Sequence, residues 1–144
     1  MDPPVLSIVV KAGADPDYVK RRAIALAPGS IVQTVSADAA SNGFLVEMIA
    51  AQTLRAKGTP SQLAKRPEVD LLLRLAGTTQ ISRAIEQIGA RKGRPFLLVI
   101  AGPSRRIANL GAEALGGSEL GRRKLSPGEL DRVEKAALLN TQKS

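Results

Sequence analysis

The 144-residue sequence contains no histidine, no cysteine and no tryptophan. Without cysteine there can be no thiolate nucleophile and no disulfide framework, and a zinc site built from Cys and His ligands is also excluded. Without histidine there is no imidazole to act as a general base near neutral pH. Aromatic residues are limited to Tyr18, Phe44 and Phe96. We therefore do not expect a surface that recognises bases by stacking them on aromatic rings.

The sequence also lacks a long apolar run. No segment approaches the roughly 20 apolar residues that a membrane-spanning helix needs. Residues 1–4 are acidic and proline-bearing, and the apolar segment that follows, residues 5–10, is too short for the core of a signal peptide. From the sequence we expect a soluble, cytoplasmic protein with no membrane partner.

The charge is strongly unbalanced toward the basic side. Lys and Arg number 21 against 13 Asp and Glu, which gives a formal net charge of +8, while hydrophobic residues make up 44% of the chain. This composition is typical of one globular domain with a basic surface. A phosphate-bearing partner such as RNA or DNA would favour such a surface, although a merely solvated, soluble surface has the same composition.

Alternating elements predict an α/β fold. Strands are predicted at residues 6–10, 31–35, 69–75 and 96–101. Helices are predicted from Pro16, over 43–57, after Gly77, after Pro103 and over 126–142, the last one opened by the capping-box pattern of Ser126 and Glu129. We expect one domain over residues 1–144, with a single small mixed sheet of about four strands flanked by helices.

Two glycine turns are candidate anion sites. Gly77 and Gly102 each follow a predicted strand and precede a helix, and Thr78 and Ser104 stand near the helix starts. Exposed N–H groups and the helix dipole attract phosphate at such a place. Ordinary helix capping explains each turn taken alone.

Catalytic and metal-binding patterns are weak. The acidic residues are scattered, and Glu68 and Asp70, two positions apart on a predicted strand, are explained by solvation. The Gly77 turn lacks the second glycine and the lysine of a phosphate-binding P-loop. We therefore expect no catalytic residues, no metal and no cofactor.

Residues 68–89, EVDLLLRLAGTTQISRAIEQIG, resemble the signature of a known family. The shared features are an apolar segment led by Glu68, the pair Ala76-Gly77, the pattern Q-I-x-x-A-I from Gln80 to Ile85, and Gly89. The family is the small kinase-binding (TPRKB-type) subunit of the KEOPS (EKC) complex. An arginine is usual in this family where the chain has Thr79.

The resemblance implies a non-catalytic role in the N6-threonylcarbamoyladenosine modification of tRNA. Such a subunit binds and stimulates an atypical kinase/ATPase subunit and recruits tRNA through its single-stranded 3′ CCA end. From charge and from the geometry of the helix start, we expect this tRNA contact at Gly77, Thr78, Thr79, Gln80 and Arg83, with Arg55, Lys57, Lys65 and Arg91 as candidate partners for phosphate.

The kinase-type partner is expected on the C-terminal helix. Four consecutive apolar residues at 136–139 cannot all face one core, so this helix is either wedged deeply or offered to a partner. The candidate contacts are Leu130, Val133, Ala137, Leu138 and Leu139. Two other functions stay open: a small enzyme that holds a phosphorylated metabolite, and a generic basic nucleic-acid-binding module.

Overall fold

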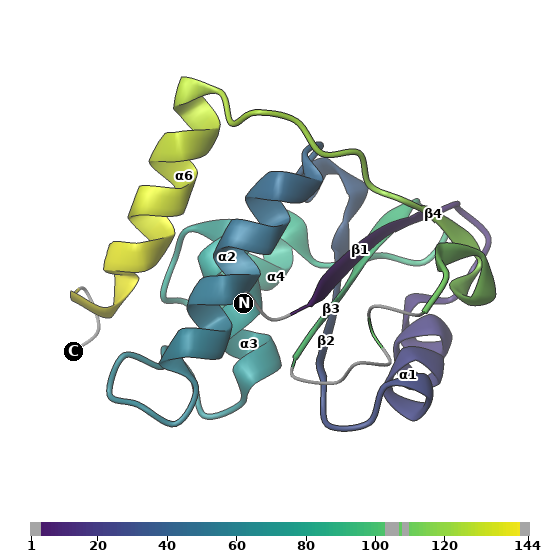
Figure 1. Ribbon diagram of the computed structural model, residues 1–144, viewed down its shortest axis with the longest axis horizontal. Helices are drawn as coiled ribbons and strands as arrows, with labels where there is room; N and C mark the ends of the chain where they lie inside the picture. Colours follow the sequence, from purple (N-terminus) through teal and green to yellow (C-terminus); the bar gives the residue numbers. More distant parts are fainter. Residues whose placement is uncertain (1–3, 103–106, 108–109, 142–144) are drawn as a thin grey trace.

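A four-stranded sheet forms the centre of the molecule in the computed structural model, which describes residues 4–102, 107 and 110–141 (Figure 1). The strands are β1 (Val5–Val10), β2 (Ile31–Ser36), β3 (Phe96–Ala101) and β4 (Gly117–Glu119), in the spatial order β2-β3-β1-β4. Each neighbouring pair is antiparallel, with Ile8 and Thr34 both opposite Leu98. The expected α/β fold with four strands and flanking helices is confirmed, and the sheet is antiparallel throughout where a mixed sheet was expected.

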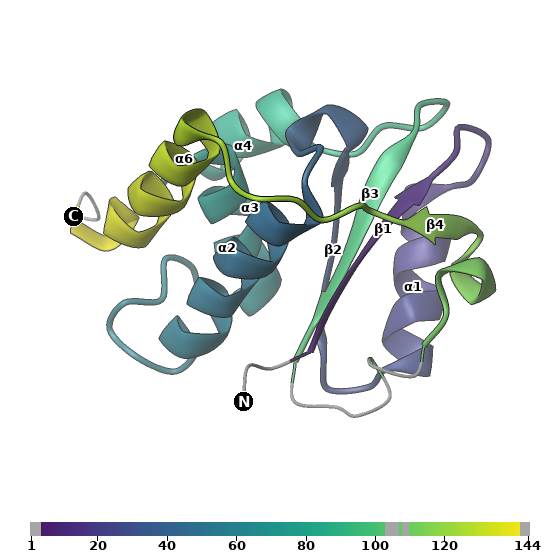
Figure 2. The ribbon, with the colours of Figure 1, turned by 45° about the horizontal axis from the view of Figure 1, so that its top comes forward.

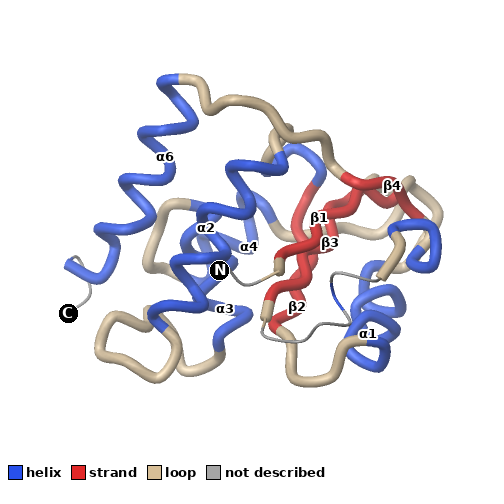
Figure 3. Tube along the Cα trace, viewed as in Figure 1, coloured by secondary structure: helices blue, strands red, loops and turns tan. Residues whose placement is uncertain are grey.

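Helices cover both faces of this sheet. They are α1 (Pro16–Leu26), α2 (Gly43–Ala56), α3 (Pro67–Ala76), α4 (Ile81–Ile88) and α6 (Pro127–Leu138), with short 3₁₀ turns η1 (Ala37–Ala39), η2 (Ala112–Leu115) and η3 (Leu139–Thr141). Helix α1 lies on one face of the sheet, whereas α2, α3 and α4 lie on the other (Figures 2 and 3). Helix α6 is outermost and packs against α2 and α3.

Two hydrophobic cores follow from the period-two alternation of the strands. Leu98 and Ile100 of β3 face α1, while Leu97 and Val99 face α2 and α3. All six residues of β3 are buried, because this strand is central and covered on both faces. The continuous apolar run at residues 96–101 predicted a strand covered on both sides, and this prediction is confirmed.

The predicted strand at residues 69–75 is wrong, because this segment is helix α3. Pro67 occupies its first turn, Glu68 and Asp70 follow, and Gly77 ends the helix in the left-handed conformation at φ 73°. These are ordinary helix signals. The sequence does not show the helical spacing of apolar residues here, because α3 packs against α2, α4, α6 and β2 at once. Residues 70–75 are therefore all buried.

The fourth strand is β4, in a segment for which the sequence predicted neither a strand nor a helix. It pairs with the outer edge of β1, with Gly117 opposite Val10. A Cβ atom at Gly117 would collide with the carbonyl oxygen of Val9. Only glycine allows so close an approach between the two backbones.

Other predicted helices are confirmed with small changes in their limits. Asp15 caps α1 and Asn42 caps α2. Helix α6 has the predicted capping box at Ser126 but ends at Leu138, where η3 begins. The helix expected after Pro103, and the turn of residues 103–106 with it, lies largely outside the described residues. No helix in the described part of the chain is long and apolar enough to cross a membrane.

The capping box makes the stability of the protein depend on pH. The hydrogen bond from the Ser126 backbone N–H to Glu129 Oε1, 3.0 Å long, lowers the pKa of the Glu129 carboxyl, and a bond from Asn42 adds to this effect. Because the pKa in the folded state lies below that in the unfolded chain, this stabilisation is complete above the ordinary carboxyl pKa of about 4.3 and is lost as the pH falls through the folded value.

We predict that the melting temperature of Glu129→Gln falls less than that of the wild type between about pH 5 and pH 3, as followed by circular dichroism. Glu134→Gln is the matched control, because Glu134 is exposed on the same helix and has no hydrogen bond or ion pair within residues 4–102, 107 and 110–141. Equal pH curves for all three proteins would contradict the prediction.

Candidate functional site

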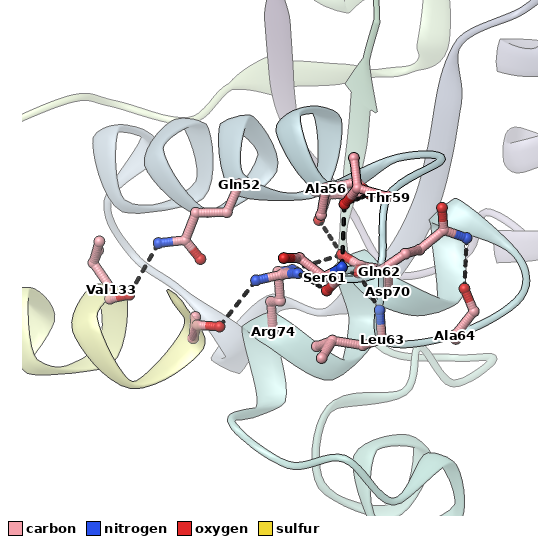
Figure 4. Close-up of polar contacts among 12 residues, drawn as sticks. Gln52, Ala56, Thr59, Ser61, Gln62, Leu63, Ala64, Asp70, Arg74 and Val133 are labelled. Carbon is pink, nitrogen blue, oxygen red and sulfur yellow. Dashed lines mark hydrogen bonds and ion pairs between the residues drawn. The ribbon is translucent and has the colours of Figure 1, made fainter. Parts of the chain in front are cut away.

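A buried ion pair lies where α2, α3 and α6 meet (Figure 4). The side chains of Asp70 and Arg74 are 0% and 4% exposed, and Arg74 Nε donates to Asp70 Oδ1 over 2.7 Å. The Asp70 carboxylate also accepts hydrogen bonds from Thr53 Oγ1 at 2.7 Å and from the backbone N–H of Leu63 at 2.9 Å. The spacing of four residues brings the two charges together on one side of α3.

The same network holds the C-terminal helix in place. Arg74 Nη1 donates to the carbonyl oxygen of Ala136 at 3.0 Å, and Gln52 Nε2 donates to that of Val133, also at 3.0 Å. Arg132 donates from α6 to the carbonyl oxygen of Leu75 at 3.0 Å, and its burial lowers the pKa of its guanidinium. An arginine stays charged even so. Helix α6 is therefore fixed by three long polar side chains as well as by its apolar side.

A hollow of about 490 Å³ opens beside this network, between α2 and α6. Its lining residues are Gln52, Arg55, Ala56, Thr59, Ser61, Arg74, Ala137 and Asn140. Gln52 Oε1 is buried and has no hydrogen-bond partner in the described part of the chain. Sequence reasoning missed both Gln52 and Arg74, because nothing in a single sequence separates a buried glutamine or arginine from a solvated one.

The candidate partner-binding residues of α6 separate onto two sides of the helix. Val133 and Leu139 are 7% and 0% exposed and belong to the core. Leu130, Ala137 and Leu138 face outward, with Leu130 46% and Leu138 59% exposed. We call Leu130, Ala137 and Leu138 the α6 stripe. In the apolar run at 136–139, Ala136 and Leu139 are thus buried, while Ala137 and Leu138 are exposed.

The candidate RNA-binding turn joins two helices, so the expected strand–glycine–helix arrangement at Gly77 is wrong. Gly77 is the C-cap of α3 and Gln80 is the N-cap of α4. Thr78 Oγ1 accepts a hydrogen bond from the Gln80 backbone N–H at 3.2 Å, and Thr79 lies between them, half-buried. Arg83 is exposed in the first turn of α4. The turn still precedes the N-terminus of a helix, where anions are favoured.

One further cation lies at this turn. The side chain of Lys135 reaches from α6 over Gly77, so that a Cβ atom there would lie 3.7 Å from Lys135 Nζ. Lys135 is more than 50 residues from Gly77 along the chain, and no sequence pattern links the two. Tertiary packing alone brings this ammonium group to the turn.

The other cations expected to bind tRNA do not form one patch. Arg55 lies in the last turn of α2, Lys57 is its C-cap, and Lys65 lies in the loop before α3. Arg91 follows α4, and its Nη2 donates to the carbonyl oxygen of Glu86 at 3.1 Å. In Figures 1 and 2 the loop over 57–66 and the turn over 91–94 lie at opposite ends of the molecule.

Within the described residues, no three acidic side chains gather where they could hold a metal ion. A smaller hollow of about 190 Å³ is lined by Asp38, Arg91 and Arg94 among others. Another, of about 230 Å³, lies on the outer side of α2 beside Phe44 and Met48.

No protein-family model matches the chain, and no curated protein sequence matches it.

The buried ion pair gives a stability prediction. Arg74→Met would leave the Asp70 carboxylate buried without its counter-charge, and we expect a loss of about 3–5 kcal/mol in the free energy of unfolding, measured by denaturant titration. Arg66→Met is the control, because Arg66 pairs with Glu68 while its own side chain is 76% exposed. We expect Arg66→Met to lower the free energy of unfolding by about 1 kcal/mol or less.

The double variant Asp70→Leu/Arg74→Met removes both charges together. It should lose less stability than the sum of the two single variants. Additive losses, or a loss below about 1 kcal/mol in Arg74→Met, would show that the pair is not coupled as described.

Proposed function

We propose that this chain is a non-catalytic, cytoplasmic subunit of a KEOPS-type tRNA-modification complex. In this role it binds and stimulates a kinase/ATPase subunit and recruits tRNA through the 3′ CCA end. The proposal begins from the resemblance of residues 68–89 to that family, and two features of the molecule support it.

The α6 stripe is the observation that carries the proposal. Leu130 and Leu138 are eight residues apart, so they lie on one side of the helix, and both are exposed. The opposite side of α6 is packed and hydrogen-bonded to α2 and α3. A helix with exposed leucines is a suitable surface for a partner protein, because covering the exposed half of each leucine contributes about 1 kcal/mol.

The turn between α3 and α4 supports the part of the proposal that concerns RNA binding. Arg83 lies in the first turn of α4, and Lys135 adds a second positive charge at Gly77, the C-cap of α3. Neither has an ion pair or hydrogen bond to another of the described residues. The proposal therefore keeps Gly77, Thr78, Thr79, Gln80 and Arg83 as contacts for tRNA and adds Lys135. Lys57 and Lys65 remain candidates in the loop before α3, and Arg91 would belong to a separate contact.

A generic basic nucleic-acid-binding module remains a second candidate. It is favoured by the wide spread of the cations, because α1 also carries exposed Arg21 and Arg22 on the far side of the sheet. Such a module would bind any duplex with a steep salt dependence and no preference for tRNA.

Partner binding can be tested with Leu138→Glu. The charge would be placed in an apolar contact, so affinity for the kinase subunit should fall by tenfold or more, while the melting temperature should change little because Leu138 is 59% exposed. Ile24→Glu is the matched control, since Ile24 is 46% exposed on α1, across the sheet. Co-purification that survives in Leu138→Glu would exclude the α6 stripe as the contact.

Recruitment of tRNA can be tested by gel shift with tRNA that lacks its CCA end. We expect affinity to fall at least tenfold, and Arg83→Glu should weaken binding of intact tRNA and reduce the salt slope by about one. Arg21→Glu, an equal change of charge on α1, should have a smaller effect. Unchanged binding of the shortened tRNA would rule out recognition of the tail, and equal binding of a DNA duplex would favour the generic module.

A further inference from the structure

One buried side chain joins the beginning of α2 to the segment that leads to α6. We call residues 120–126, which run from β4 past the beginning of α2 to α6, the strap (Figure 2). Asn42 is 0% exposed, and its Oδ1 accepts hydrogen bonds from the backbone N–H groups of Phe44 and Arg123, both at 3.0 Å. Its Nδ2 donates to the carbonyl oxygen of Arg123 at 3.0 Å and to Glu129 Oε1 at 3.4 Å. The carboxamide thus holds the strap to α2 and contacts the capping box of α6.

Asn42 is also the one asparagine that precedes a glycine in the sequence, since Asn109 and Asn140 precede leucine and threonine. In an open chain such a pair is chemically reactive, because glycine has no side chain to hinder attack on the preceding carboxamide. The backbone nitrogen of Gly43 gives its proton to solvent and forms a bond to Asn42 Cγ. The bond from Cγ to Nδ2 then breaks, and that nitrogen takes up a proton and leaves as ammonia. Water opens the cyclic imide at one carbonyl or the other to give aspartate or isoaspartate, and no oxidant is needed.

The folded protein opposes this reaction. The Gly43 N–H donates to the carbonyl oxygen of Gly121 at 2.8 Å, which holds the attacking nitrogen against the strap. The hydrogen bonds of the carboxamide hold Asn42 Cγ and the leaving nitrogen in place, and its burial keeps water away. We propose that Asn42 is a deamidation site which the strap protects, and that the reaction keeps the strap open once it has occurred. This inference does not depend on the proposed function.

Packing explains why a glycine stands at this vulnerable position. A Cβ atom at Gly43 would lie 2.7 Å from the carbonyl oxygen of Leu120, so the strap can approach α2 this closely only over glycine. The contact that protects Asn42 therefore requires the residue that makes it reactive. Gly43→Ala would hinder the attack and displace the strap together, and it cannot distinguish the two effects.

Deamidation changes the contacts that the side chain can make. A carboxylate has no N–H, so both bonds donated by Nδ2 are lost, and a negative oxygen replaces the nitrogen that lies 3.4 Å from Glu129 Oε1. The carbonyl oxygen of Arg123 faces the same negative charge. The Arg123 guanidinium already pairs with Glu129 at 3.6 Å, so it would have to serve two carboxylates. Like charges in a buried site repel strongly, and the strap would not close again over the product.

The test follows deamidation of the purified full-length protein by mass spectrometry of the intact chain and its peptides, in mildly alkaline buffer with and without denaturing urea. At Asn42 the folded protein should react at least about tenfold more slowly than the unfolded chain, because attack requires the strap to open. Arg123→Ala removes side-chain bonds to Ser41 and Glu129 and should speed the reaction in the folded protein at least about threefold. Lys124→Ala is the matched control and should react as the wild type does, because Lys124 is exposed on the same strap and makes no hydrogen bond or ion pair with another described residue.

Asn42→Asp reproduces one product of the reaction, and aged wild-type protein in which Asn42 has deamidated serves as the second sample. Trypsin cleaves after Lys and Arg, so residues 122–124 report directly whether the strap is open. Brief digestion should cut both samples within residues 122–124 at least about fivefold faster than fresh wild type. Asn42→Ser, which keeps a capping side chain without a charge, should be cut more slowly than Asn42→Asp.

Equal rates at Asn42 in the folded and unfolded protein would exclude protection by the strap, and so would equal rates in Arg123→Ala and Lys124→Ala. An unfolded chain that keeps Asn42 intact would exclude the deamidation site itself. If trypsin cuts the deamidated protein no faster than fresh wild type, an open product is excluded. None of these measurements involves the kinase subunit or tRNA, so failure of this inference is distinguishable from failure of the proposed function.

Discussion

The burial of one charge pair constrains the whole helical side of the molecule. Neither Asp70 nor Arg74 can be removed from water alone without a cost of several kcal/mol. Their remaining hydrogen-bonding groups are satisfied by Thr53 of α2, by the backbone of Ser61 and Leu63 in the loop before α3, and by Ala136 of α6. All of these segments must therefore be in place together, and the pair links the order of the loop to the position of the terminal helix.

The proposed activity depends on this link. Helix α6 is held by hydrogen bonds of Gln52, Arg74 and Arg132 in addition to its apolar packing. Its outer leucines, the Lys135 ammonium group at Gly77 and the hollow beside Ala137 are presented on a rigid support as a result. Rigid presentation reduces the entropy lost when a partner binds.

The sequence predicted the candidate site only in part. It identified the exposed cations and the apolar terminal helix, because charge, capping and spacing are local properties. It could not show that Leu138 is exposed whereas Leu139 is buried. That difference depends on which side of the C-terminal helix packs against α2 and α3. Arg91 was grouped with Arg55 although the fold places them apart, and Lys135 was missed although the fold brings it to Gly77. Each error concerns a distance between segments that are remote in the sequence.

The sequence alone determined those elements whose signals are local: the central strand at Phe96–Ala101, the helix start at Pro16, the capping box at Ser126 and the α/β class. The helix over residues 67–76 carries its end signals, Pro67 and Gly77, in the sequence. Its interior was mistaken for a strand because a segment surrounded by packing partners loses the apolar period by which a helix is recognised. Tertiary structure decided that β4 exists, since three residues without strong strand propensity pair only because the edge of β1 offers them hydrogen bonds. Burial and pairing are set by the neighbours that a segment acquires on folding, and a single sequence does not contain them explicitly.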